Sequence, residues 1–286
     1  MSNLSYTGMT HQGQVRGDNQ DSIYLPQGGC SLPCLFLVAD GMGGANGGKT
    51  ASELAVSIVS EEFHQNQRKH GPELALRNAV KKANSTIYYK AQAEQDLRGM
   101  GTTLIGLAVL SDNRALIINV GDSRCYLLRE GELHQLSEDH SVVQEMVREG
   151  KLTDEQARSN GMRNMLSRAV GAAAEVKEDL FAVTALEIND TFLLCSDGLH
   201  GPVPEERIRE TLQQSLDISG KAQQLLRLAN DNGGPDNISV ILVRVNQSEY
   251  LPEPDEVTFR KNVPMTKKQT GATSSLSGFL GRFFNK

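Results

Sequence analysis

Four aspartates stand at the ends of apolar segments in this chain of 286 residues. Asp40 follows LFLVA, Asp122 follows LIINVG, Asp197 follows FLLCS, and Asp236 lies just before ISVILV. Any one of them suits a turn, because Asp and the neighbouring Gly tolerate turn dihedrals. As a group they are different, because clustered carboxylates repel and raise one another's pKa unless cations neutralise them. If the segment ends converge, an all-oxygen ligand set favours hard divalent ions such as Mg²⁺ or Mn²⁺.

The apolar segments that precede these aspartates have the length and composition of strands. Strands are predicted over 34–39, 102–110, 115–120, 125–129, 191–195 and 238–245. Short connections, such as GDSR at 121–124, permit antiparallel pairing and exclude a crossover helix. Helical periodicity predicts helices over 73–94, 141–149 and 221–230, and a capping box at 153–156 opens a further short helix. The pattern is typical of one α+β domain.

Composition and charge set limits on the kind of protein. Hydrophobic residues make up 38% and charged residues 22%, as in globular proteins. No secretory signal or apolar run of membrane-spanning length is visible, so we expect a cytosolic protein. The net charge is −6, and six Lys/Arg without any acid after residue 256 leave −12 on the preceding residues, which argues against nucleic acid as a partner. Cys34, Cys125 and Cys195 lie in or beside apolar runs and are expected to be reduced core residues, and scattered Cys30 completes no zinc motif.

Seven short motifs occur in a recognisable order. They are VRGDNQD (15–21), DGMGG (40–44), GTT (101–103), GDSR (121–124), DHS (139–141), SDGL (196–199) and GPDN (234–237). Over roughly residues 6–245 the chain resembles the PPM, or type 2C, metal-dependent Ser/Thr phosphatases in their compact bacterial form. The resemblance implies a four-layer αββα sandwich of two largely antiparallel sheets flanked by helices. It places a phosphatase domain at 1–246, a flap subdomain at about 141–175, and a basic tail at 247–286.

The same resemblance implies a metal centre built from aspartates. Asp40 would bridge two tightly bound Mn²⁺ or Mg²⁺ ions, and the Gly41 carbonyl would help to bind the second ion. Asp197 and Asp236 would complete the first ion's ligands, and Asp21 would belong to the second, partly through water. Two adjacent ions lower the pKa of a shared water, so that hydroxide can attack phosphorus in line near neutral pH.

Two further residues are assigned by the resemblance, and two positions depart from the family. Arg16 would clamp the substrate phosphate, and Arg16 and Asp40 are the expected catalytic residues. Asp122, with Asp197, would hold a weaker third ion. Gln20 replaces a glutamate of some relatives, and Met42 stands where eukaryotic relatives carry a proposed acid, which leaves the proton donor open.

Other motif residues receive structural roles or none. Thr102 and Thr103 are expected to pack and hydrogen-bond beside the site, and His140 is expected to be structural. For Arg163 and Arg168 in the flap, contact with a phosphoprotein and a plain surface role both stay open.

The expected function is hydrolysis of phosphoserine and phosphothreonine in proteins. Its partners would be phosphorylated proteins, a cognate bacterial Ser/Thr kinase and that kinase's substrates, and the protein would be a monomer. Two alternatives stay open. The chain could be a non-catalytic module that keeps the phosphatase fold, which loss of Asp40, Asp197 or Asp236 would have marked. It could also be a nucleotide-binding protein, because the segment from Gly43 to Thr50 satisfies G-x-x-x-x-G-K-[ST].

The tail carries a separate pattern. Leu276, Phe279, Leu280, Phe283 and Phe284 form one helical stripe. We expect 274–286 to become helical when it docks on a partner protein, with an anionic membrane surface as the second choice. A tail without fixed structure is the alternative, because so short a helix is marginal in water.

Overall fold

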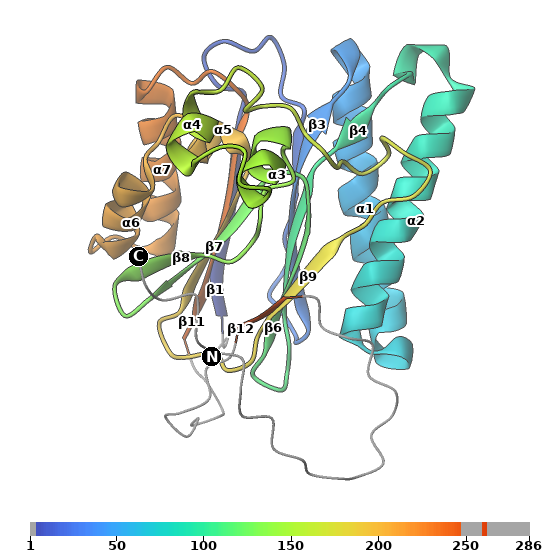
Figure 1. Ribbon diagram of the computed structural model, residues 1–286. Helices are drawn as coiled ribbons and strands as arrows, with labels where there is room; N and C mark the ends of the chain where they lie inside the picture. Colours follow the sequence, from blue (N-terminus) through green and yellow to red (C-terminus); the bar gives the residue numbers. More distant parts are fainter. Residues whose placement is uncertain (1–3, 247–258, 262–286) are drawn as a thin grey trace.

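Two stacked antiparallel sheets form the centre of the molecule (Figure 1). The computed structural model describes residues 4–246 and 259–261, with side chains left out at 45–46, 154, 158–159 and 259–261. The smaller sheet has the strand order β1 (Leu4–His11), β11 (Ile238–Val245), β10 (Thr191–Cys195), β7 (Arg124–Arg129) and β8 (Glu132–Gln135). The larger has the order β12 (Phe259–Lys261), β9 (Asp179–Val183), β6 (Ala115–Val120), β5 (Leu104–Val109), β3 (Cys34–Met42) and β2 (Asp21–Tyr24), and β4 (Gly101–Thr102) pairs with β3.

Helices cover the outer faces of both sheets, which confirms the predicted αββα sandwich (Figure 1). Helices α1 (Gly44–His70) and α2 (Pro72–Ala93) pack on the larger sheet. Helices α6 (Glu205–Gln213) and α7 (Ile218–Asp231) pack on the smaller one. Because every central strand is covered on both faces, its sequence is apolar at successive positions rather than alternating.

Strand β3 shows how this double burial works. Leu35 and Leu37 belong to the core beneath α1 and α2. Phe36 and Val38 belong to the core between the two sheets. Successive side chains of a strand point to opposite faces, so one apolar run supplies both cores. The strand also extends three residues beyond the predicted end at 39, so that Asp40 and Gly41 are strand residues.

The helical predictions were right in type, and one long helix was missed. Helix α2 matches the prediction over 73–94, α7 contains 221–230, and α3 (Val142–Arg148) begins after Ser141 as its N-cap. The capping box at Thr153 opens α4 (Asp154–Ser159). Helix α1 was not predicted, because three glycines among its first five residues lower helix propensity. Its remaining length is stabilised by packing, with Ala55, Val59 and Phe63 fully buried.

Part of the expected tail belongs to the larger sheet. Residues 259–261 form β12, which pairs antiparallel with β9 in the register Phe259 to Val183 and Lys261 to Phe181. The prediction that the fold ends near 246 therefore needs this correction for three residues. The amphipathic stripe at 274–286 lies outside the described residues.

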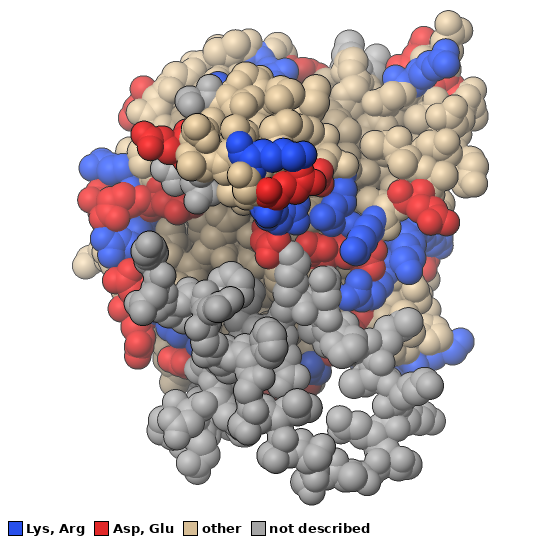
Figure 2. All heavy atoms as spheres, in the orientation of Figure 1, with Lys and Arg blue, Asp and Glu red and all other residues tan. Residues whose placement is uncertain are grey.

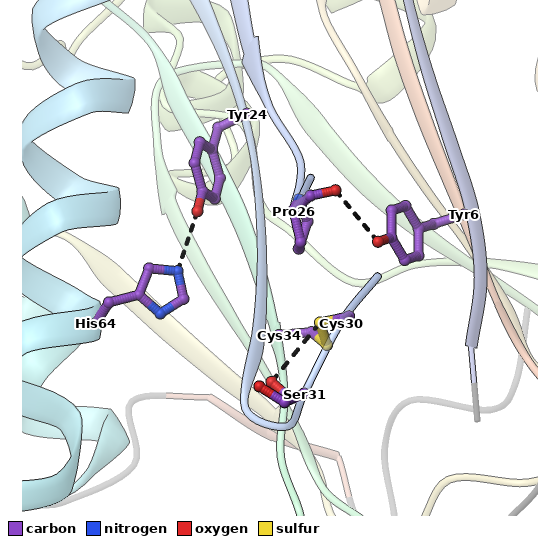
Figure 3. The surroundings of a disulfide bond; sticks show 7 residues. All are labelled: Tyr6, Tyr24, Pro26, Cys30, Ser31, Cys34 and His64. Atoms are coloured by element: carbon purple, nitrogen blue, oxygen red, sulfur yellow. Dashed lines mark hydrogen bonds between the residues drawn. A yellow bond between two sulfur atoms is a disulfide. The ribbon is translucent and has the colours of Figure 1, made fainter. Parts of the chain in front are cut away.

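The cysteine prediction was wrong for one pair. Cys30 and Cys34 form a disulfide across the loop between β2 and β3, with their Cα atoms 5.9 Å apart (Figure 3). The spacing of four residues gave no C-x-x-C signal, and the turn of the loop brings the two sulfurs together. Nearby, Tyr24 and His64 form a side-chain hydrogen bond of 3.1 Å between β2 and α1 (Figure 3). Cys125 and Cys195 are buried free thiols, as expected.

The distribution of surface charge and the apolar length of the helices are two further properties of the molecule. On the face drawn in Figure 2, basic and acidic side chains are interspersed. Among the helices of the described part, none is both long enough and apolar enough to cross a membrane.

Candidate metal and phosphate site

The sheet topology brings five predicted aspartates to one end of the sandwich. Strand β2 begins at Asp21, which is the cross-strand partner of Asp40 near the end of β3. Asp122 lies in the turn from β6 to β7, and Asp197 opens the short helix α5 (Asp197–His200) after β10. Asp236 lies just before β11, whose Val240 pairs with Cys195 at the end of β10. Antiparallel pairing places the end of β3 beside the start of β2 and the end of β10 beside the start of β11. The turn at 121–123 joins the end of β6 to the start of β7, which lies in the other sheet, so these two strands do not pair with each other.

Asp40 is held by backbone and threonine contacts. Its N–H donates to Thr103 Oγ1 at 2.9 Å. Its carbonyl accepts from Thr102 Oγ1 at 2.8 Å and from the Thr103 N–H at 2.9 Å. These contacts confirm that the two threonines hydrogen-bond beside the site, as expected.

The next residue, Gly41, allows α1 to approach the site. A Cβ at Gly41 would lie 2.1 Å from the carbonyl oxygen of Gly48. Only a glycine fits this contact between β3 and the first turns of α1. Residues 44–48 belong to helix α1, so they do not form the open loop that a nucleotide phosphate cradle requires.

Asp21 and Asp197 each leave a buried oxygen without a partner. Asp21 is 7% exposed, and its Oδ2 accepts from Ser196 Oγ at 2.8 Å. Neither Asp21 Oδ1 nor Asp197 Oδ1 has a hydrogen-bond partner. A buried, unpaired carboxylate oxygen is costly, and a cation ligand is the natural way to satisfy it. The serine that precedes Asp197 in SDGL was the signal in the sequence for the contact with Asp21.

Burial and mutual repulsion raise the pKa values of this group. Burial, opposed by hydrogen bonds from Ser239 and Ser196, raises the pKa of Asp21 to about 7. Burial and the charge of Asp236 raise the pKa of Asp197 to about 6, although a hydrogen bond with Asp40 opposes the shift. Burial first, and then the other aspartates, raise the pKa of Asp40 well above its usual range. These shifts are those expected of carboxylates assembled to bind cations.

Arg16 forms an ion pair with one of these acids. Its Nη2 lies 2.6 Å from Asp236 Oδ2, and this contact is the largest cause of the raised pKa of Arg16. In this arrangement no three His, Cys, Asp or Glu side chains among the described residues are placed to hold a metal ion together. The guanidinium takes the place of a cation at Asp236, so that metal binding there requires this carboxylate to exchange partners. The oxygen-only donors and the two unpaired buried oxygens nevertheless fit divalent ions.

Asp122 is held by a histidine and faces a second acid. His200 Nε2 lies 3.0 Å from the Asp122 carbonyl, and burial lowers the pKa of this histidine to about 3, so the neutral ring donates here. Burial and the charges of Asp197 and Asp139 raise the pKa of Asp122 to about 8. Asp139, which sequence reasoning left without a role, accepts from Arg124 Nε and Nη2 at 2.9 Å and 2.7 Å. Its place in the DHS motif was the feature of the sequence that could have indicated a role for Asp139.

His140 is structural, as predicted. It is fully buried, its Nδ1 accepts from the Gly121 N–H at 3.1 Å, and its Nε2 faces Asp179 Oδ2 at 3.3 Å. Both ring nitrogens are therefore used in contacts within the fold. Arg168 is also engaged internally, through Asp179 Oδ1 at 3.3 Å, whereas Arg163 is exposed. Gln20, the neutral substitute, hydrogen-bonds to Asp18 Oδ2 and the Gly44 carbonyl, each at 3.1 Å.

Comparisons with known proteins show the family of this chain. A family model described as Protein phosphatase 2C matches residues 8–232. The chain is 40% identical over 240 residues to a serine/threonine phosphatase stp of Listeria welshimeri, covering 83% of this chain and 94% of that one.

Two solved structures share the fold. The catalytic domain of the serine/threonine phosphatase PstP, solved with two manganese ions, superposes with a TM-score of 0.75 at 37% identity, covering 85% of this chain and 99% of that one. A serine/threonine phosphatase of S. agalactiae gives 0.78 at 35% identity, covering 85% and 100%.

The chain therefore belongs to the protein phosphatase 2C family. It is a phosphatase, a hydrolase of phosphoric monoesters, and the three aspartates whose loss would mark a non-catalytic relative are all present.

Proposed function

We propose that this phosphatase hydrolyses phosphoserine and phosphothreonine in proteins with the help of divalent metal ions. The observation that supports this most directly is the group of aspartates at one end of the sandwich, two of which carry buried oxygens without partners. Bound Mn²⁺ or Mg²⁺ would neutralise these charges and lower the pKa of a water molecule toward neutrality. Water would attack phosphorus in line, and the bond from phosphorus to the serine or threonine oxygen would break. One proton from the water would end on that oxygen, so that the products are the free alcohol and inorganic phosphate.

Each site residue has a distinct part in this proposal. Asp40 and the Gly41 carbonyl would hold two ions from β3, with Asp197 and Asp236 on the first ion and Asp21 near the second. Arg16 would leave Asp236 and bind two oxygens of the substrate phosphate through its guanidinium fork, because a planar pair of donors matches the phosphoryl group.

A third, weaker ion would be bound by Asp122 and Asp197. Asp122 follows β6 and Asp197 follows β10 at the same end of the sandwich, and after burial the charge of Asp197 is the next cause of the raised pKa of Asp122. Asp122→Ala should leave two tightly bound ions and remove only the third in a Mn²⁺ titration. An unchanged count of bound ions would contradict this assignment.

The biological setting extends the proposal. Phosphorylated proteins would be the substrates, a cognate Ser/Thr kinase would be opposed, and the enzyme would act as a monomer in the cytosol. The domain would span 1–246 together with β12, with the flap at about 141–175, and the end of the tail at 274–286 would dock on a partner protein.

The decisive experiment measures release of phosphate from a phosphothreonine peptide and hydrolysis of p-nitrophenyl phosphate. Both activities should require Mn²⁺ or Mg²⁺ and stop when EDTA is added. Full activity after thorough chelation would refute the metal-dependent mechanism, and activity on p-nitrophenyl phosphate alone would refute the proposed protein substrates.

A further inference from the structure

The loop that carries Arg16 lies directly against the loop that carries Asp236. The Gln14 N–H donates to the Gly234 carbonyl at 2.8 Å. Gly13 has a φ of 82°, and a Cβ there would lie 2.1 Å from the carbonyl oxygen of Asp236. The two backbones therefore touch, and the space between them admits no side chain at position 13.

One buried side chain ties both ends of this loop to the second loop. Asn237 is 5% exposed and directly follows Asp236. Its Oδ1 accepts from the Gln20 N–H at 2.8 Å. Its Nδ2 donates to the carbonyls of Gln12 and Asp18, each at 2.8 Å. The two N–H donors and the oxygen of the Asn237 amide thus all hydrogen-bond to backbone groups, at both ends of the segment 12–20.

A second hydrogen bond connects Gln12, which Asn237 holds, to Arg16. Gln12 Nε2 donates to the Arg16 carbonyl at 2.6 Å, so the residue that Asn237 holds in turn holds Arg16. Apolar packing contributes little here, because the neighbouring Val15 is 71% exposed. The side chain of Arg16 is itself 56% exposed and forms an ion pair with Asp236. Hydrogen bonds, rather than a core, order the loop.

We propose that Asn237 is the positioning residue of the phosphate-binding arginine. It acts through the backbone of Gln12 and Asp18, and it keeps the Arg16 guanidinium above the aspartate group before substrate arrives. This inference rests on the proposed role of Arg16 in binding phosphate. A pre-ordered guanidinium binds the phosphate without first losing loop freedom, so loss of the clamp should weaken phosphate binding more than it slows the bound substrate.

A matched control exists elsewhere in the fold. Asn84 on α2 is 2% exposed, and its amide is used in the same way on a different loop. Its Oδ1 accepts from the Gly171 N–H at 2.7 Å, and its Nδ2 donates to the carbonyls of Ala173 and Ala174 at 3.0 Å and 3.1 Å. Asn237→Ala and Asn84→Ala therefore remove the same three kinds of bond, but only the first frees the Arg16 loop.

The test compares these variants at saturating Mn²⁺ with p-nitrophenyl phosphate as substrate. Asn237→Ala should raise both KM and the inhibition constant of inorganic phosphate about tenfold or more, with a smaller effect on kcat. Asn84→Ala should leave both constants near their wild-type values. Gln12 is exposed, and Gln12→Ala should also raise KM and the inhibition constant of inorganic phosphate. This variant tests the same proposal if Asn237→Ala does not fold.

A double-mutant cycle separates the possible failures. If Asn237 acts through Arg16, then Asn237→Ala should change KM less than about twofold in an Arg16→Ala background. An unchanged KM in Arg16→Ala alone would overturn the role of Arg16 and this inference with it. A raised KM in Arg16→Ala, but not in Asn237→Ala and Gln12→Ala, would overturn only the positioning role. If the effects of Arg16→Ala and Asn237→Ala on KM were fully additive, the positioning role alone would likewise be overturned.

Discussion

At the scale of single residues, Asp236 has two competing uses. Its carboxylate forms an ion pair with Arg16 at 2.6 Å, and the proposed chemistry needs the same carboxylate as a metal ligand. Asp236→Asn removes the charge that both uses depend on while keeping nearly the same shape. We expect kcat for p-nitrophenyl phosphate to fall by about 100-fold or more, since losing about 3 kcal/mol of transition-state stabilisation has that effect.

Asp112 provides a control for the charge change. It is an exposed acid between β5 and β6, paired with Arg114 at 2.7 Å, at the end of the strands away from the aspartate group. Asp112→Asn should leave kcat unchanged. If Asp236→Asn kept a near wild-type kcat with Mn²⁺ present, Asp236 would not be a metal ligand.

At the scale of elements, the start of α1 must lie close to the end of β3. A Cβ at Gly48 would lie 2.7 Å from the carbonyl carbon and oxygen of Gly41 and 2.2 Å from Gln20 Oε1. Gly48→Ala should therefore lower the free energy of unfolding by about 1–3 kcal/mol, as overpacking does, and should also lower kcat because the Gly41 carbonyl shifts.

The adjacent glycine gives the comparison. A Cβ at Gly47 would meet only Met100 Cβ, at 3.1 Å, among close contacts. Gly47→Ala should lower the free energy of unfolding much less, because the gain in helix propensity of about 1 kcal/mol offsets the tight contact. Urea unfolding of both variants measures the difference. Equal destabilisation by the two would show that the approach of β3 and α1 is not the constraint.

The loop between β2 and β3 yields a second prediction at this scale. The disulfide closes a loop of only a few residues, so reduction should lower the free energy of unfolding by about 2 kcal/mol. Cys34 begins β3 and Asp40 lies six residues further along, which places the disulfide about 20 Å from the site. The melting temperature should therefore respond to reductant while kcat does not. Cys30→Ser should abolish that response, and a kcat that fell on reduction would contradict the local role.

At the scale of the whole molecule, the aspartate group makes metal-free stability depend on pH. Asp21 and Asp122 have folded-state pKa values of about 7 and about 8, far above their usual unfolded value. The folded protein then binds protons that the unfolded chain has lost, so stability falls as pH rises through this window. His200, whose pKa is lowered to about 3, has the opposite dependence, but that contribution is complete above about pH 6.5.

The measurement is thermal unfolding of EDTA-treated protein between about pH 6.5 and 8.5. The melting temperature should fall as pH rises, and added Mn²⁺ should raise it most at the upper end, where the carboxylates are ionised. A melting temperature that rose with pH in EDTA would show that the carboxylates are stabilised as anions by the protein itself.

The apolar runs and the motif aspartates were sufficient to predict the layers of the fold and the end of the sandwich where the aspartates gather. Largely apolar runs at 115–120, 191–195 and 238–245 matched β6, β10 and β11 residue for residue, because strands covered on both faces are apolar at most successive positions. The aspartates at their ends then marked the edge where chemistry could occur.

Other features of the fold and the site depend on contacts between distant parts of the chain, which local sequence patterns do not contain. Helix α1 forms despite its glycines because it packs on the larger sheet, and the edge strands β1 and β2 are only partly buried, so neither gave a clear periodicity. The ion pair of Arg16 with Asp236 and the three bonds of Asn237 join residues more than 200 positions apart. Such contacts depend on the register of β1 against β11, which no local pattern of side chains specifies.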